Sequence, residues 1–342
     1  MVKKLSFHDS FKKIIPFAKT IANVFGVLAV VGFISFGAMT YWALDYFKSP
    51  GPLQQETLLV IPEGSSLKSI SHILSDNNVI KYPEVFSLII RFSESGSRMK
   101  AGQYKFTSKI APVQVFAKVA SGQVVSHKVT IPEGLMAFQI LEIIKNAPYM
   151  KGQVPDNIKE GELLPETYDY HYGDDRAGIV ARMRQKMQKV LDSAWEKRAD
   201  NLPIKTKEEA LVLASIIEKE TAIAGERKEV ASVFVNRLRK GMRLQTDPTV
   251  IYAITEGKYV LERPLYYKDM KIDSPYNTYK NYGLPPFPIA NPGKDAIEAA
   301  LNPADTDYYY FVADGTGGHK FSTTLKEHNN NVQKWRKINR KK

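Results

Sequence analysis

One uncharged stretch near the amino terminus restricts the possible folds of this chain more than any other feature. Residues 21–44 (IANVFGVLAVVGFISFGAMTYWAL) contain no charged side chain, and about 20 apolar residues are enough for a helix to cross a bilayer. Tyr41 and Trp42 lie at its outer end, where amphipathic rings prefer the interface. A cleaved signal peptide is the alternative, but the run is longer than a signal core and no small-residue cleavage site follows it. The stretch therefore predicts a retained single-pass membrane anchor.

Charged residues on either side of this stretch predict its orientation. Asp45 and Lys48 follow it, whereas its amino-terminal side carries one acidic residue, Asp9, and five lysines: Lys3, Lys4, Lys12, Lys13 and Lys19. Short loops rich in lysine stay in the cytoplasm. We therefore expect residues 1–20 in the cytoplasm and the chain from about residue 46 onward on the outer side of the cell (inner) membrane.

Composition limits the remaining chemistry. The 342 residues include no cysteine, which excludes disulfides and thiolate metal sites. The formal charge of +12 favours anionic partners, such as a polymer that carries carboxylates or an anionic membrane surface. The basic residues are not interleaved with aromatic ones, so nucleic acid is not expected as a partner. The six histidines have no metal-ligand spacing, and no metal or other cofactor is expected.

Two related segments predict an internal repeat. Residues 57–64 read TLLVIPEG and residues 128–134 read KVTIPEG, and a helical pattern follows each of them, at 67–74 and 137–144. A Pro/Gly linker at 45–55 precedes the first unit. We interpret residues 56–150 as a compact α+β module for binding or scaffolding, since they hold no cluster of ionisable residues.

The remainder of the chain predicts a second α+β domain at 151–330 and a basic carboxy-terminal tail at 331–342. Its expected elements are helices at 179–199, 207–221, 226–240 and 294–301, an extended segment at 242–248, a long loop at 274–293, and strands at 308–313 and 320–323. The glycine-rich residues 314–319 (DGTGGH) lie between the two strands and lack P-loop spacing, so they predict a hairpin turn.

A carboxylate on the apolar face of the helix at 207–221 is the strongest candidate for chemistry. Glu220 falls on the face formed by Val212, Leu213, Ile216 and Ile217, whereas Glu218 points the other way. Burial raises the pKa of a carboxyl group and makes it a proton donor near neutral pH. The alternative is a structural glutamate paired with Arg237 or Arg243.

Several motifs resemble the YceG-like (MltG) family of endolytic murein transglycosylases. They are ASIIEKET, ERKEVASVFVNRLRKGMRLQTDPTVIY, SPYNTY, GLPP, PIANPG, YYYFVADGTGGHKFS and the VIPEG turns, in the family's order from residue 56 to 330. The chain departs from the pattern at Phe287, where the family usually has glycine after two prolines, so no contact is assigned there.

The resemblance implies a membrane-anchored enzyme that cuts nascent peptidoglycan strands internally. The cut falls between N-acetylmuramic acid and N-acetylglucosamine, leaves a 1,6-anhydromuramic end and terminates glycan elongation. The resemblance also implies a LysM-like amino-terminal module, a lysozyme-like catalytic fold with one essential glutamate, and association with peptidoglycan synthases. A hydrolytic muramidase and a non-catalytic glycan-binding scaffold of the wall-synthesis machinery are the alternatives.

The same resemblance assigns roles to individual residues. Lysozyme-like lytic transglycosylases carry their acid in a Glu-Ser or Glu-Thr pair, which here is Glu220–Thr221, with Glu218 as the alternative. Asp247 is expected to cap or brace a turn. Five motif positions are expected to line the glycan cleft, or alternatively to brace loops: Asn236, Gln245, Tyr276, Asn277 and Tyr279.

Overall fold

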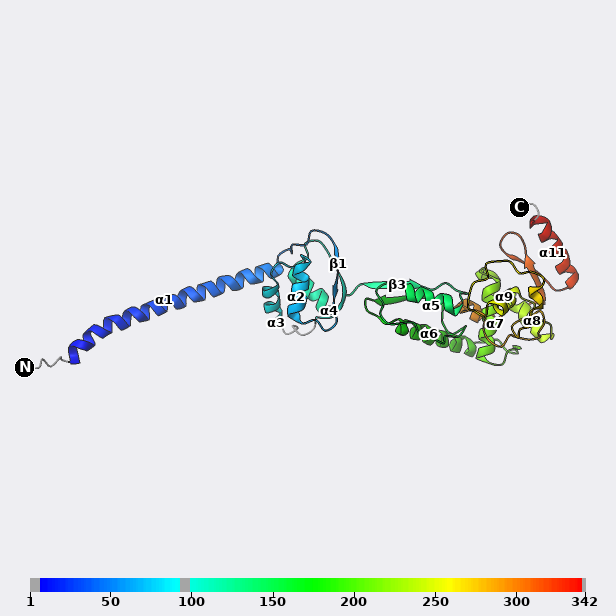
Figure 1. Ribbon diagram of the computed structural model, residues 1–342, viewed down its shortest axis with the longest axis horizontal. Helices are drawn as coiled ribbons and strands as arrows, with labels where there is room; N and C mark the ends of the chain where they lie inside the picture. Colours follow the sequence, from blue (N-terminus) through cyan, green and yellow to red (C-terminus); the bar gives the residue numbers. More distant parts are fainter. Residues whose placement is uncertain (1–6, 93–98, 340–342) are drawn as a thin grey trace, which may run out of the picture. The chain divides into compact units, whose positions relative to one another are not determined.

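The computed structural model describes residues 7–92 and 99–339, with side chains from residue 19 onward (Figure 1). Most of the charged residues behind the predicted orientation of the anchor, including Lys3 and Asp9, therefore lie outside the described side chains. The chain divides into two compact units, Met1–Val125 and Ser126–Lys342. Both combine helices with short two-stranded antiparallel sheets, which agrees with the predicted α+β class.

The first unit begins with one long helix, α1 (Phe7–Lys48). Its span Lys19–Lys48 is long and apolar enough to cross a membrane. The large apolar side chains between Ile21 and Leu44 are exposed instead of packed in a protein core; Phe33, for example, is 79% exposed. A helix with apolar residues on all sides needs an apolar surrounding such as lipid.

The predicted linker at 45–55 is instead part of the folded unit. The rings of Phe47 and Phe86 pack with centroids 5.9 Å apart. Leu53 is only 4% exposed and belongs to the hydrophobic core. These apolar side chains fix the carboxyl end of α1 to the module, because exposing them to water would be unfavourable.

The rest of the first unit is a two-stranded sheet with three helices. Strand β1 (Thr57–Ile61) pairs antiparallel with β2 (Gly102–Phe106), and Ile61 lies opposite Gly102. The helices are α2 (Leu67–Asp76), α3 (Pro83–Arg91) and α4 (Pro112–Ser121). Their core contains fully buried Leu74, Phe86 and Phe106. The helix expected at 67–74 is confirmed with a shifted end.

The second copy of the repeat belongs to the second unit. Strand β3 (Ser126–Thr130) pairs with β4 (Thr167–His171), and these strands share a core with α5 (Ala137–Asn146) and α6 (Arg176–Glu196). The boundary between units therefore lies at 125–126 instead of the expected 150. Pairing of two strands that flank residue 150 ties both sides of that position into one fold.

The helical core of the second unit follows. It contains α7 (Lys207–Glu220), α8 (Arg227–Arg239), α9 (Asp247–Thr255) and α10 (Lys294–Leu301), with single 3-10 turns at Ala224–Glu226 and Asp269–Lys271. Leu213, Ile217, Phe234 and Ile297 meet in this core. Helix α9 is not among the predicted elements. Pro248 reads as a helix breaker, but here it stands in the first turn, where proline is tolerated.

A hairpin and a last helix complete the unit. Strands β5 (Tyr310–Ala313) and β6 (His319–Ser322) pair with Ala313 opposite His319, which confirms the predicted glycine-rich hairpin turn. Helix α11 (Leu325–Asn339) follows and begins before the predicted basic tail.

Candidate active site

Helix α7 carries Glu220 at its carboxyl end. The helix starts at the cap residue Thr206, whose hydroxyl accepts the N–H of Glu209 at 3.1 Å. It stops after Glu220 because Thr221 adopts an extended conformation, with φ −142° and ψ 131°. The last helical residue, Glu220, is thus held in place by a packed helix.

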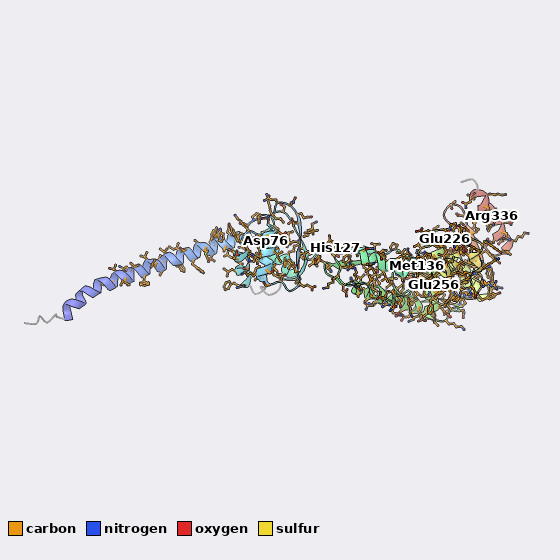
Figure 2. All side chains as sticks on the ribbon, in the orientation of Figure 1. Asp76, His127, Met136, Glu226, Glu256 and Arg336 are labelled. Carbon is orange, nitrogen blue, oxygen red and sulfur yellow. The ribbon has the colours of Figure 1, made fainter. Side chains whose placement is uncertain are left out.

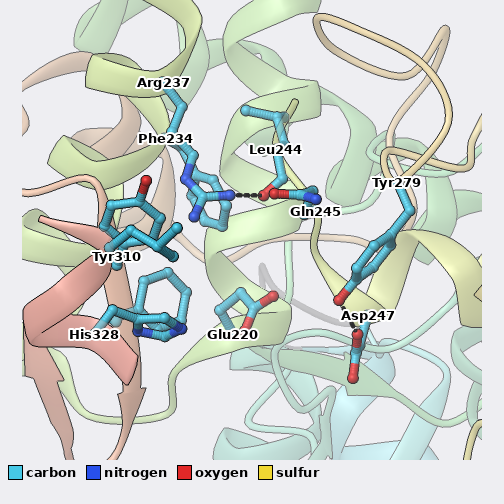
Figure 3. A pocket seen from close by; sticks show the side chains of 11 residues that line it. Glu220, Phe234, Arg237, Leu244, Gln245, Asp247, Tyr279, Tyr310 and His328 are labelled. Atoms are coloured by element: carbon cyan, nitrogen blue, oxygen red, sulfur yellow. Dashed lines mark hydrogen bonds between the residues drawn. The ribbon is translucent and has the colours of Figure 1, made fainter. Parts of the chain in front are cut away.

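Glu220 lines a cavity of about 420 Å³, called the α7 cavity below (Figure 3). The cavity draws on α7, α8, α9, β5, α11 and the loop after the 3-10 turn at 269–271. Its lining residues are Glu220, Phe234, Arg237, Leu244, Gln245, Asp247, Tyr279, Tyr310, Phe311, Leu325 and His328. Aromatic rings, hydrogen-bonding groups and two helix-end carboxyls, Glu220 and Asp247, therefore converge on one space.

The environment of Glu220 favours its protonated form. Burial raises the pKa of the Glu220 carboxyl, the hydrogen bond that the Thr246 hydroxyl donates to Oε1 partly offsets this rise, and nearby Asp247 adds to it. The carboxyl end of a helix also disfavours negative charge. Thr246 is held in turn, since its N–H donates to the hydroxyl of Thr278 at 3.2 Å. The result is a positioned proton donor.

Glu220 is not part of an ion pair with either arginine. The guanidinium of Arg237 donates to the carbonyl oxygens of Tyr309 at 2.7 Å and Leu244 at 2.8 Å, the latter visible in Figure 3. In the described part of the chain neither Arg237 nor Arg243 forms a salt bridge with Glu220. The alternative of a paired structural glutamate therefore does not fit Glu220.

The alternative of a paired structural glutamate fits Glu218 instead. The side chain of Glu218 is only 4% exposed; its Oε2 accepts the N–H of Gly293 at 2.9 Å, and its Oε1 lies 3.4 Å from Nη2 of Arg227. Both sides of α7 are covered, since Ala214 and Ser215 are as buried as the face that carries Glu220. The helix-face expectation that Glu218 points away from the core needs this correction. Glu218 does not line the α7 cavity.

Two of the five expected cleft residues line the α7 cavity. Gln245 has a left-handed backbone, with φ 51°, and its N–H donates to the carbonyl of Thr278 at 3.2 Å. Such strained backbone in a non-glycine residue is typical of functional sites. The hydroxyl of Tyr279 donates to Oδ1 of Asp247 at 2.6 Å (Figure 3). Asp247 thus braces a loop, as expected, while also facing the cavity.

The other three expected cleft residues, Asn236, Tyr276 and Asn277, do not line the α7 cavity. The side-chain amide of Asn236 donates to the carbonyl of Thr306 at 2.7 Å, and that of Asn277, fully buried, donates to the carbonyl of Ile272 at 2.8 Å. Both asparagines brace backbone, because their donors are used by carbonyl groups inside the fold. Tyr276 lines a second cavity at the other end of α9.

Sequence reasoning missed the part of the cavity wall that β5 and α11 contribute. The rings of Tyr310 and His328 stack with centroids 5.2 Å apart. Burial lowers the pKa of His328, and its Nδ1 is a buried atom without a hydrogen-bond partner among the described residues. No local pattern marks His328, since only the packing of α11 on the hairpin brings it here. No group of three or more potential metal ligands occurs in the described part of the chain.

Glu220 and Asp247 both face the aromatic-lined α7 cavity, and a buried carboxyl group of the Glu220 kind serves as the acid in enzymes that cleave glycosidic bonds. The chain belongs to the YceG-like family, whose model matches residues 59–334. It is similar to the endolytic murein transglycosylase of Bacillus subtilis (strain 168), with 38% identity over 308 residues that cover 80% of this chain and 83% of the relative.

Two further comparisons found similar proteins. The endolytic murein transglycosylase of Streptococcus pneumoniae serotype 2 (strain D39 / NCTC 7466) is 30% identical over 319 residues, covering 80% of this chain but 57% of that longer relative. The crystal structure of a YceG-like protein from Listeria monocytogenes is 35% identical, covers 81% of this chain and 99% of that chain, and superposes with a TM-score of 0.47.

Proposed function

We propose that this protein is a membrane-anchored peptidoglycan lytic transglycosylase that cuts glycan strands internally and ends their elongation. Family membership and the relatives named endolytic murein transglycosylase support the reaction class. The observation that carries the mechanism is the placement of Glu220 at the end of α7, facing the α7 cavity with a raised pKa.

In the proposed reaction Glu220 acts first as acid and then as base. Its carboxyl proton passes to the glycosidic oxygen as the bond from that oxygen to C1 of the muramic residue breaks. The resulting carboxylate then takes the proton from the C6 hydroxyl, whose oxygen bonds to C1 and closes the 1,6-anhydro ring. Glu220 ends protonated as it began. Because the nucleophile belongs to the substrate, neither water nor a second carboxylate is needed.

Other lining residues have supporting roles in this proposal. Gln245 and Tyr279 remain the predicted sugar contacts, and Tyr310 adds its aromatic ring to the cavity wall. Asp247 keeps a hydrolytic mechanism as the second candidate, since a carboxylate in the same cavity could activate water.

The first unit supports a location at the membrane. The apolar span Lys19–Lys48 is compatible with a single-pass anchor. We propose that the amino terminus is cytoplasmic, that both units lie outside the cytoplasm, that residues 56–125 form a LysM-like glycan-binding module, and that the enzyme works beside peptidoglycan synthases.

Mass spectrometry of products from uncrosslinked glycan strands tests the function. We expect anhydro-ended fragments from the wild type and from Glu218→Gln, and a loss of activity of at least about 10²-fold in Glu220→Gln, which lacks the transferable proton. Thermal melts of the three proteins control for folding.

Three outcomes would contradict the proposal in different ways. Loss of activity only in Glu218→Gln would move the acid to Glu218. Fragments with reducing ends would indicate a muramidase that uses water. Absence of cleavage by wild type that still binds the strands would indicate a non-catalytic scaffold.

A further inference from the structure

A second cavity lies at the other end of α9, and nothing in the proposed reaction uses it. This α9 cavity measures about 490 Å³ and combines residues from five separate stretches of the second unit. Met136, the neighbour of the lining residue Ala137, and Glu256 are labelled close together in Figure 2. The lining residues that matter here are Phe138, Glu160, Tyr252, Gly257, Tyr276 and Phe287.

Glu160 presents one uncommitted oxygen to this cavity. Its Oε2 accepts the N–H of Ala137 at 2.9 Å and the side-chain amide of Asn291 at 3.0 Å. These two bonds fix the carboxylate and leave Oε1 without a hydrogen bond within the described residues. A carboxylate held in this way is ready to bind a donor from outside without reorganising.

Gly257 keeps the space beside that oxygen open. A methyl group on Gly257 would lie 2.9 Å from Oε1 of Glu160 and 3.1 Å from the Tyr252 hydroxyl. The residue also has φ +69°, a backbone conformation that glycine adopts without strain. The Oε1 atom and the hydroxyl therefore border the same small space.

The walls around this oxygen are aromatic and the rim is acidic. The rings of Tyr252 and Tyr276 lie 4.7 Å apart, and Phe287 is 59% exposed at the rim. Among the lining residues Lys159 is the only cation, against the three carboxylates of Asp156, Glu160 and Glu256. This is an acidic, aromatic pocket in a chain with a formal charge of +12.

We propose that the α9 cavity binds a primary ammonium group on an aliphatic chain, supplied by the free side-chain amine of an uncrosslinked stem peptide. The ammonium donates to Oε1 of Glu160, and its positive charge faces the aromatic rings of Tyr252 and Tyr276. The aliphatic chain packs against Phe138 and Phe287. Recognition of an ammonium group follows from the cavity, whereas its origin in a stem peptide rests on the proposed function.

The position of the cavity suits a peptide branch of the bound strand. Asp247 in the α7 cavity and Tyr252 in the α9 cavity are five residues apart on one helix, about 7.5 Å along its axis. The loop at 274–281 also reaches both cavities, through Tyr279 and Tyr276. An extended tripeptide spans about 10 Å. A peptide on the muramic residue at the first cavity can therefore reach the second.

The titration of Glu160 gives this binding a characteristic pH dependence. Burial raises the pKa of Glu160 to about 7, although the hydrogen bonds from Ala137 and Asn291 and the charge of Lys219 lower it. Burial also raises the pKa of the facing Tyr252 and Tyr276 hydroxyls, so both stay neutral between pH 6 and 8. An ammonium group binds the carboxylate form, so its affinity increases from pH 6 to pH 8.

Calorimetric titration of the full chain with two soluble tripeptides tests the site. One is alanyl-γ-glutamyl-lysine with a free side-chain amine, and the other is acetylated on that amine. We expect acetylation to weaken binding to the wild type by about tenfold at pH 8, the value of one charge-assisted hydrogen bond. The difference should shrink at pH 6, where more of Glu160 is protonated.

Three variants make the test specific to the proposed contacts. In Glu160→Gln the advantage of the free-amine peptide should disappear. The glutamine oxygen has to accept from Ala137 and Asn291, so its NH2 group replaces Oε1 and offers an ammonium neither charge nor an acceptor. In Phe287→Ala, whose exposed side chain is dispensable for folding, both peptides should bind more weakly to a similar extent. Glu162→Gln removes a carboxylate from the same segment that is paired with Arg184 outside the cavity, and it should behave as wild type.

Equal binding of both peptides by the wild type would overturn the proposal and favour a neutral ligand, such as a sugar. If Glu160→Gln does not fold, the comparison of the two peptides on the wild type and on Phe287→Ala still tests the proposed site. The tripeptides contain no glycosidic bond, so the result is independent of cleavage. A chain that cuts strands without discriminating the peptides refutes this site alone, and a chain that discriminates them but cuts nothing refutes the proposed function alone.

Discussion

Two glutamates, Glu218 and Glu220, lie two residues apart on α7, and their different surroundings suit them to different roles. Burial raises the pKa of both carboxyls. Glu218 is enclosed with a cation, Arg227, and a backbone N–H, which use its oxygens within the fold. Glu220 has a single hydroxyl donor, Thr246, and an open cavity beside it. Only the second arrangement leaves a proton within reach of a substrate.

Replacing Thr246 by valine should move the pH–rate profile. The Thr246 hydroxyl stabilises the carboxylate of Glu220 and so lowers its pKa; without it the pKa rises further. Glu220 must be protonated at the start of the reaction, so activity falls as pH rises through this pKa. The alkaline limb of the profile for Thr246→Val is therefore expected at higher pH than in wild type, with a free energy of unfolding lower by about 1 kcal/mol.

Thr167→Val is a suitable control, since Thr167 lies on β4, far along the chain from this site, and its profile should match wild type. An unchanged alkaline limb in Thr246→Val, together with normal folding, would show that another group is the acid.

At the scale of elements, one arginine joins the helices that position the site. Arg227, in the first turn of α8, is 7% exposed. Its guanidinium contacts Glu218 of α7 at 3.4 Å, Asp295 of α10 at 3.2 Å, and Glu133 in the second Pro-Glu-Gly turn at 2.9 Å. The repeated turn therefore contributes a carboxylate that ties the β3–α5 segment to the helical core.

Truncation of this arginine should destabilise the second unit strongly. Arg227→Ala leaves Glu218 buried without its cation, and loss of one partner of a buried pair costs about 3–5 kcal/mol of unfolding free energy. The loss should be greater at pH 8 than at pH 5, because Glu218 can escape the unpaired charge by protonation at low pH. Urea denaturation at both pH values measures it.

Lys258→Ala serves as the control, because the pair of Lys258 with Glu256 is exposed and should matter little. Arg227→Lys should recover only part of the stability, since one ammonium cannot contact three carboxylates as a planar guanidinium does. A similarly small effect of Arg227→Ala and Lys258→Ala would contradict a structural role for this cluster.

At the scale of the whole molecule, the apolar span Lys19–Lys48 and the two cavities belong to different units. The core of the first unit involves residues from Leu53 to Val119, and the two cores of the second unit involve residues from Val129 to Leu301. Both cavities are lined only by residues of the second unit. Each unit therefore has its own apolar interior to stabilise it.

A fragment of residues 126–342 should fold alone and cut soluble strands. It retains Glu220, both cavities and its own cores, and it lacks only α1 and the first module. Circular dichroism with thermal melting tests its folding, and release of anhydro-ended products tests its activity. A fragment that stays unfolded, or that folds without cutting strands that the full chain cuts, would show that the first unit contributes to the site.

Local sequence patterns were sufficient for much of this protein. The uncharged run predicts the apolar span of α1, period-3.6 patterns predict α2, α5, α7 and α8, and the glycine-rich turn predicts the β5–β6 hairpin. The helix-face argument also selects Glu220. These features depend on residues within a few positions of one another, where backbone geometry fixes which side chains share a face.

Long-range contacts decided the rest. The unit boundary at 125–126 depends on the pairing of β3 with β4. The burial of Glu218 depends on its contact with Arg227. The α7 cavity depends on the docking of α11, which brings His328 to it. Sequence therefore determined most of the helices, the β5–β6 hairpin and the candidate acid of this protein, although not α9. Only the tertiary structure decided which side chains face solvent, carbonyl groups or a cavity, because those surroundings come from segments distant in the chain.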